Sequence, residues 1–266
     1  MPADPDQMRG VARSAALVGG RTVRAGARPV GGDAKGPPGD WVTAVDVESE
    51  RAVSGFLGSE TPGIPIQGEE LGGPDAGLRW VVDPLDGTTN YLHGFWAVGV
   101  SVALVDDDAV VAGAVHAPFL DETWHAGRGA GAAWERGAGA TACRVGDRPP
   151  AEAIVGTGFP FRRKERIPRY LAVLEGSLRV FEDLRRPGAA SLDLAWVACG
   201  VFDGFFELGL SPWDVAAGGL LIQEAGGVVS DWDGGGGYLG GNILAGSPTI
   251  HAELVRIVGE RPAGSG

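Results

Sequence analysis

Two aspartates, Asp83 and Asp86, stand at the end of an apolar segment that begins at Trp80 and runs into a Gly-Thr-Thr turn. Carboxylates at a strand end, followed by small residues with available backbone N–H groups, can hold a metal ion and a phosphate together. The same letters also suit an ordinary turn, because Asp-Pro and Asp-Gly dipeptides commonly end strands. Residues elsewhere in the chain must decide between the two interpretations.

Two further acidic residues could join this pair. Glu69 follows a short predicted strand, and Asp214 stands directly before an apolar helical segment. Hard divalent cations such as Mg²⁺ take oxygen ligands, which carboxylates from separate segments can supply. Each residue also has an alternative interpretation. Ser211, Pro212 and Asp214 resemble a capping box at a helix start, and Glu69 could be an ordinary solvated acid.

The composition narrows the class of protein. The chain has 266 residues, of which 44% are apolar, and a net charge of −12. This length allows one large domain with a sizeable core. The acidic balance argues against nucleic acid or an anionic membrane as a partner, since no excess of Lys and Arg exists to neutralise phosphates. An acidic enzyme that acts on an anion would need metal ions to reverse the local field.

The sequence also indicates a cellular setting. Cys143 and Cys199 are the two cysteines, and they lie far apart in no metal-ligand spacing. We therefore expect neither a disulfide framework nor a zinc site, and a reduced, cytoplasmic environment. The N-terminus lacks the basic start and apolar run of a signal peptide. The longest apolar run, 95–105, is too short to span a bilayer.

Three other patterns have simpler explanations. Residues 127–132 fit G-x-G-x-x-A in their letters, but no long helix follows, so a β-turn is expected there. The histidines show no metal-pair spacing and are expected to be structural. The basic run 162–166 suits a solvated helix start, and alternatively a lip that attracts an anionic substrate. The histidines are His93, His116, His125 and His251.

The periodicity of apolar residues predicts the elements that must position these side chains. Helices are expected over 6–27, 46–57, 163–176, 188–200, 213–225 and 248–259. Strands are expected over 64–66, 97–105, 109–117, 121–126, 178–182, 202–208, 227–231 and 242–246. This mixed order indicates sheets layered with helices, not a regular βαβ series.

Taken together, these residues resemble the inositol monophosphatase family of Mg²⁺-dependent, lithium-sensitive phosphatases. The likeness rests on the motif at 83–90, on a second motif at 213–227, and on Gly68-Glu69-Glu70 upstream of both. It extends from about Lys35 to the final helix. The resemblance implies an α/β (α+β) fold, a layered αβαβα sandwich of the inositol monophosphatase and fructose-1,6-bisphosphatase type. It also implies one domain over 1–266, with a metal and phosphate half at about 1–145 and a substrate-pocket half at about 146–262.

The resemblance further assigns roles to residues. Asp46 would pair with Thr88 to orient the attacking water, with Glu69 as a third catalytic residue. Two to three Mg²⁺ ions would be bound by the backbone carbonyl of Leu85 and by four carboxylates, those of Glu69, Asp83, Asp86 and Asp214. Substrate would be bound by Gly87 and Thr88 through their backbone N–H groups, and by Lys35, Ala189, Ala190, Glu207 and Asp214.

These assignments imply a phosphomonoesterase acting on inositol monophosphate or a similar small polyol phosphate, as a homodimer. The alternatives are the same chemistry on histidinol phosphate, a sugar bisphosphate, a nucleotide or a specialised-metabolism phosphate, or a non-catalytic metal-binding regulatory protein. The Asp46 and Thr88 pair disfavours the last of these, because binding alone needs no water-orienting pair. Two departures bear on substrate choice: Trp96 stands where the family commonly has Pro, and Ala189 where relatives often carry a hydroxyl.

Overall fold

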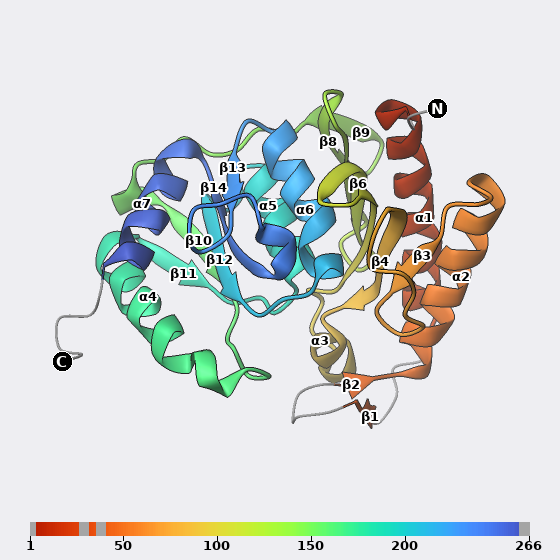
Figure 1. The fold of residues 1–266 in the computed structure, drawn as a ribbon, viewed down its shortest axis with the longest axis horizontal. Helices are drawn as coiled ribbons and strands as arrows, with labels where there is room; N and C mark the ends of the chain where they lie inside the picture. The colour runs from red at the N-terminus through yellow and green to blue at the C-terminus, as the bar shows by residue number, and fades with distance from the viewer. Residues whose placement is uncertain (1–3, 27–31, 36–40, 261–266) are drawn as a thin grey trace.

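Three pairs of helices alternate with two β-sheets in the computed structural model, which describes residues 4–26, 32–35 and 41–260 (Figure 1). One outer pair is α1 (Pro5–Ala25) and α2 (Ala44–Glu60), the middle pair is α5 (Ala190–Ala198) and α6 (Pro212–Glu224), and the other outer pair is α4 (Ile167–Val180) and α7 (Pro248–Gly259). This order of layers confirms the αβαβα sandwich that the resemblance implied.

The first sheet has seven strands in sequence order. They are β3 (Ile66–Gly68), β4 (Leu78–Asp86), β5 (Gly99–Asp106), β6 (Ala109–Ala117), β7 (Glu122–Gly127), β8 (Gly131–Arg136) and β9 (Gly139–Ala142). β3 and β4 are parallel, and all later neighbours are antiparallel. A one-and-a-half-turn helix, α3 (Thr88–His93), follows β4 directly.

The second sheet has five strands in the order β11 (Asp183–Arg185), β10 (Ile154–Thr157), β12 (Gly204–Leu208), β14 (Asn242–Gly246) and β13 (Val228–Ser230). The remaining elements are a short pair, β1 (Asp33–Ala34) with β2 (Trp41–Val42), and 3₁₀ turns at Pro150–Glu152, Lys164–Arg166 and Tyr238–Gly240. The chain passes from the first sheet to the second between Ala142 and Ile154, close to the predicted division at about 145. That both halves make one domain stays a prediction.

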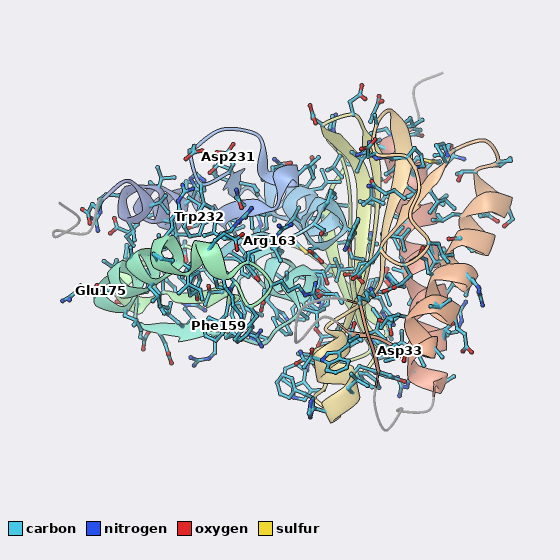
Figure 2. The ribbon with its side chains drawn as sticks, turned by 60° about the horizontal axis from the view of Figure 1, so that its bottom comes forward. Asp33, Phe159, Arg163, Glu175, Asp231 and Trp232 are labelled. Carbon is cyan, nitrogen blue, oxygen red and sulfur yellow. The ribbon has the colours of Figure 1, made fainter. Side chains whose placement is uncertain are left out.

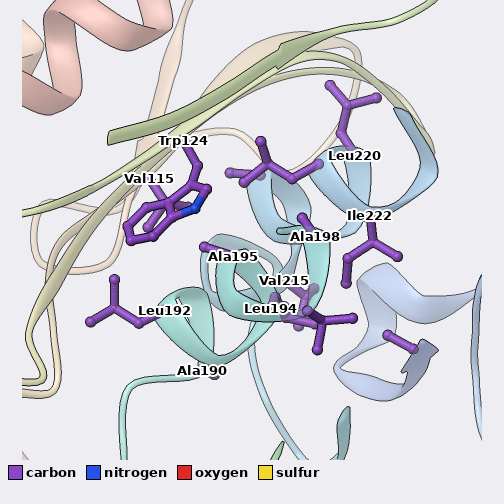
Figure 3. Close-up of a cluster of buried hydrophobic side chains, with 14 of the residues drawn as sticks. Val115, Trp124, Ala190, Leu192, Leu194, Ala195, Ala198, Val215, Leu220 and Ile222 are labelled. Carbon is purple, nitrogen blue, oxygen red and sulfur yellow. The ribbon is translucent and has the colours of Figure 1, made fainter. Parts of the chain in front are cut away.

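Each space between layers is filled by its own hydrophobic core. Strand alternation divides β4 between two of them, since Trp80 and Val82 pack toward α1 and α2 while Val81 packs toward α5 and α6. Figure 3 shows the middle core, where Trp124 of the first sheet lies over Leu192 of α5. The third core joins the second sheet to α4 and α7. A strand buried on both faces gives the site a rigid base.

Most predicted elements are found within a few residues of their expected bounds. The strand predicted at 178–182 is wrong, because α4 continues to Val180 and the strand is Asp183–Arg185. Val180 continues the buried face of α4 that carries Val173 and Ser177, and this helical period outweighs the strand-like composition of the segment. The strand predicted at 64–66 begins later, at Ile66.

Six helices and strands of the described chain were missed, namely α3, β1, β2, β8, β9 and β10. β8 and β9 are rich in Gly and Ala, which have low β-propensity. The turn expected at 127–132 is confirmed, because it joins β7 to β8, with Gly129 and Gly131 at positive φ. No helix in the described part of the chain is both long and apolar enough to cross a membrane.

Candidate active site

An irregularity in β4 brings Asp83 and Asp86 into the same pocket. In a regular strand, residues three apart point to opposite faces. Here Asp83 pairs with Ser101 and Asp86 with Gly99, so three steps on β4 correspond to two on β5. This extra residue is a bulge, which re-aims the side chains that follow it. Both aspartates therefore line one cavity.

Asp214 reaches these two aspartates from the first turn of α6. Carboxylate oxygens of Asp83, Asp86 and Asp214 lie within 4.8 Å of one another. The Ser211 backbone N–H also donates to Asp214 Oδ2 over 2.7 Å, so the capping role that the sequence suggested is confirmed. The same carboxylate thus begins a helix and belongs to the acidic cluster.

Burial and mutual repulsion make this cluster costly in its charged form. Burial, followed by the charges of Glu69 and Asp86, raises the pKa of Asp83 well above its usual value. Burial raises the pKa of Asp86 to about 6, and burial with the charge of Asp86 raises that of Asp214 to about 8. Divalent cations would remove this repulsion, so the residues present fit a metal site.

Glu69 lies at the edge of the same cavity, in the loop after β3. Its backbone N–H donates to the Val82 carbonyl over 3.1 Å, and its carboxylate Oε1 accepts from Lys35 Nζ over 3.1 Å. Lys35 also forms an ion pair with Glu70. Lys35 therefore lies beside the site, as predicted, but on the acidic loop and not among the cavity-lining residues.

The predicted contact between Thr88 and Asp46 is confirmed. Thr88 Oγ1 donates to Asp46 Oδ1 over 3.0 Å and also lies 3.2 Å from the Leu85 carbonyl oxygen. Asp46 is buried and its Oδ2 accepts from the Thr43 backbone N–H, which caps α2. Gly87 turns the chain from β4 into α3 with a φ of 89°, and a Cβ there would lie 2.9 Å from the Ala97 carbonyl oxygen. Only glycine suits that turn.

The cavity has a volume of about 410 Å³ and extends from the acidic cluster to residues of the second half. Glu207 and Ala190 line it, as predicted, whereas Ala189 is fully buried and does not. Burial and the charge of Asp214 raise the pKa of Glu207 to about 8. Arg162 and Arg163 also line the cavity, which favours the substrate lip over a purely solvated helix start.

Two features of the cavity were missed. Arg186 lines it, with its guanidinium carbon 5.3 Å from the ring centre of Phe159 and 5.4 Å from that of Phe161. Phe159 lies on the side formed by the second half of the chain, as Figure 2 shows. Ser191 was missed as a partner of Asp86: its N–H and Oγ both donate to Asp86 Oδ2, over 2.8 and 2.6 Å. Ser191 directly follows Ala189 and Ala190, which were predicted to bind substrate, and Arg186 lies three residues before Ala189, so this neighbourhood was the available signal.

Trp96 and two of the histidines lie away from this chemistry. Trp96 is 46% exposed, does not line the cavity, and meets Trp196 edge-on with ring centres 6.0 Å apart. His116 Nδ1 lies 3.0 Å from the Glu122 carbonyl oxygen, and His125 Nε2 lies 3.2 Å from a Glu135 oxygen. Both histidines connect strands of the first sheet, which fits the structural role expected of them.

Known proteins share both this fold and this sequence pattern. The model of the inositol monophosphatase family matches residues 4–263, so the likeness begins at α1 and not near Lys35. An inositol-1-monophosphatase from Mesorhizobium japonicum is 41% identical over 83% of this chain and 84% of its own length. The Nus factor SuhB of Escherichia coli is 42% identical over 79% of each chain. The crystal structure of the extragenic suppressor protein suhB from Bartonella henselae has a TM-score of 0.87 and 36% identity, covering 96% of this chain and 99% of its own.

Proposed function

This chain belongs to the inositol monophosphatase family and is a phosphoric monoester hydrolase, and on that premise we propose its metal and substrate. It acts with Mg²⁺ on inositol monophosphate or a similar small polyol phosphate. One observation carries the proposal: the acidic cluster of Asp83, Asp86 and Asp214 lines the same cavity as Thr88, which is hydrogen-bonded to Asp46.

Two to three Mg²⁺ ions would be held by the acidic end of the cavity. Asp83 would suit a position between two ions, because the charges of Glu69, Asp86 and Asp214 all act on its carboxylate. When bound, the ions lower the pKa of a water and neutralise charge on the leaving oxygen. The ligands would be Glu69, Asp83, the Leu85 carbonyl, Asp86 and Asp214.

The residues around the cluster orient the reacting groups. Thr88 donates a hydrogen bond from its hydroxyl to Asp46, so the lone pairs of the Thr88 oxygen can accept a hydrogen bond from the attacking water and orient it. Glu69 faces the same cavity and would complete the water's surroundings. The backbone N–H groups of Gly87 and Thr88 would bind the phosphate. Such groups act mainly by positioning and by neutralising charge.

The far end of the cavity would select the alcohol. Glu207 can bond substrate hydroxyls either as donor or as acceptor, because its raised pKa of about 8 lets it keep a proton at neutral pH. Arg162, Arg163 and Arg186 would attract an anionic substrate. They also keep the alternatives open, since histidinol phosphate, a sugar bisphosphate or a nucleotide would each leave its non-reacting end near this basic lip.

Phosphate release from a panel of phosphomonoesters, with and without Mg²⁺, tests the proposal. We expect turnover of polyol phosphates that depends on Mg²⁺ and is inhibited by Li⁺. A folded protein that hydrolyses none of the panel with Mg²⁺ would exclude the proposed activity and leave the regulatory alternative. Preference for a bisphosphate or a nucleotide would retain the chemistry and replace the substrate.

We further propose that the protein is a cytoplasmic homodimer. Phe95 and Trp96 are large exposed aromatic side chains on one surface, which supports a subunit contact there. Sedimentation of Trp96→Ser against the unchanged protein tests this, and a dimer of unaltered stability would reject that surface.

The name Nus factor describes the Escherichia coli relative. For this chain, the expectation of no nucleic-acid partner rests on its net charge of −12 and stays a prediction.

A further inference from the structure

One face of α2 carries three buried polar side chains that the proposed reaction uses only in part. Asp46, Ser49 and Glu50 are spaced as i, i+3 and i+4, so they lie together on one face of the helix. All three are at most 1% exposed. Polar groups buried this deeply cost free energy unless each finds a partner.

Each of these side chains contacts a different segment of the active site. Asp46 accepts from Thr88 of α3, as described above. Ser49 Oγ donates to the Pro84 carbonyl over 2.9 Å, within the bulge between Asp83 and Asp86. Glu50 accepts two backbone N–H groups, from Glu70 over 2.8 Å and from Leu71 over 2.9 Å. One helix face thus reaches the three segments that carry Glu69, the Leu85 carbonyl and the hydroxyl of Thr88.

The Glu50 contact leaves no room for a side chain at the preceding strand end. A Cβ added to Gly68 would overlap the Glu50 carboxylate. The carboxylate therefore packs directly against the backbone before Glu69, while its two oxygens hold the backbone after it. Two parallel N–H bonds to one carboxylate fix the orientation of a loop as well as its position.

We propose that Glu50 is a positioning residue for metal binding, which holds the 69–71 loop so that the Glu69 carboxylate faces the acidic cluster. Ser49 acts in the same way on the carbonyl segment that includes Leu85. The proposal rests on the metal ligands given under the proposed function, and it adds that α2 sets the affinity of the site. Groups that hold metal ligands in place typically change metal affinity about 10- to 100-fold when removed.

The decisive variant is Glu50→Gln, with Glu48→Gln on the exposed side of the same helix as its matched control. Glutamine keeps the volume of Glu50 but can accept only one of the two N–H groups with its oxygen. Mn²⁺, used as the probe, is titrated by electron paramagnetic resonance. We expect the Kd of Glu50→Gln to rise by about 10-fold or more, and that of Glu48→Gln to stay unchanged.

The kinetics should separate positioning from general loss of structure. Glu50→Gln should need more Mg²⁺ for half-maximal turnover and recover most of its kcat at saturating Mg²⁺, because Thr88 and Asp46 remain in place. If Glu50→Gln fails to fold, Gly68→Ala probes the packing of the Glu50 carboxylate, and Ser49→Ala probes the contact of the same helix face with the Pro84 carbonyl. Weaker Mn²⁺ binding in both would support the proposal.

Unchanged Mn²⁺ affinity in every folded variant of this set would overturn the proposed positioning role of Glu50. Because Mn²⁺ binding is measured without a substrate, failure of this proposal is distinguishable from failure of the proposed phosphatase activity. A protein that binds Mn²⁺ tightly, loses that affinity in Glu50→Gln and hydrolyses no ester would retain the positioning role alone.

Discussion

At the scale of single residues, the site consists of carboxylates whose usual charge is unfavourable where they stand. Asp83 is buried, Asp86 and Asp214 lie partly buried beside it, and burial with neighbouring negative charges raises the pKa values of all three. Each also accepts a hydrogen bond from a backbone N–H group, such as that of Ser211 on Asp214. Substitutions can therefore separate the charge of a residue from its structural bond.

Asp214→Asn makes this separation. The amide oxygen can still accept the Ser211 N–H, so the start of α6 should be kept, while a negative charge leaves the cluster. Since a bound metal ion contributes several kcal/mol to such reactions, we expect turnover to fall more than about 100-fold. Phosphate release and circular dichroism, measured on the same sample, check both halves of the prediction. Near-normal turnover would refute Asp214 as a metal ligand.

We expect Thr88→Ala to disturb the position of the attacking water and to leave metal binding largely unchanged. It removes the hydroxyl that lies between Asp46 and the Leu85 carbonyl. Misplacing a reactant by about 1 Å can cost roughly 100-fold, so we expect kcat to fall on that scale with Mn²⁺ affinity largely unchanged. Steady-state kinetics and metal titration test this together. An unaltered kcat would remove the water-orienting role.

At the scale of elements, the site depends on contacts between segments that are far apart in sequence. Ser191, at the first turn of α5, donates two hydrogen bonds to Asp86 at the end of β4. These bonds lower the pKa of Asp86 against the larger effect of burial. The start of a helix in one half of the chain thus holds a carboxylate supplied by the other half.

Ser191→Ala tests this connection. Loss of the hydroxyl removes one hydrogen bond to a charged group, which typically contributes about 1.5–3 kcal/mol, and should lower the stability of the protein accordingly. Because Asp86 is then held less firmly, the Mg²⁺ concentration for half-maximal turnover should rise. Denaturant unfolding and Mg²⁺ titration measure the two effects. Ser54→Ala, on α2 and away from the cavity, is the control.

The elements also show what could be predicted from sequence. The two motifs and Gly68-Glu69-Glu70 located the acidic cluster, because the residue types themselves carry the chemistry. Arg186 and Glu50 could not be found in this way, since their roles come from neighbours such as Phe159 and Leu71 that only the folded chain supplies. The strand expected at 178–182 failed for a related reason, because the core between α4 and the second sheet extended the helix.

At the scale of the whole molecule, the charged cluster ties stability to pH. Burial makes the folded protein bind protons at these carboxyls more tightly than the unfolded chain does. Their contribution to stability is therefore fully present below the ordinary carboxyl pKa, and it is lost as pH rises through about 6 for Asp86 and about 8 for Asp214. Glu207, with a pKa of about 8, acts in the same direction.

Without metal, we therefore expect the melting temperature to decrease as the pH is raised through these values. Mg²⁺ should reverse most of this decrease, because the ions neutralise the carboxylates that the higher pH leaves charged. Calorimetry in EDTA and in excess Mg²⁺ across this range measures the effect. Asp214→Asn should show a smaller decrease in EDTA. A melting temperature in EDTA that rises with pH would contradict the assigned charge states.

The bulge in β4 gives the first motif a constraint of length as well as of composition. Deleting one residue between Asp83 and Asp86 would restore regular pairing with β5 and keep both aspartates on one face, but it would remove a carbonyl of the bulge, either the one that Ser49 contacts or the one that Thr88 contacts. Adding one would displace Gly87 from the position where a left-handed turn starts α3. Variation in this segment is thus limited to exchanges of one residue for another, and a protein with a gained or lost residue here should keep its layers yet lose its catalytic centre.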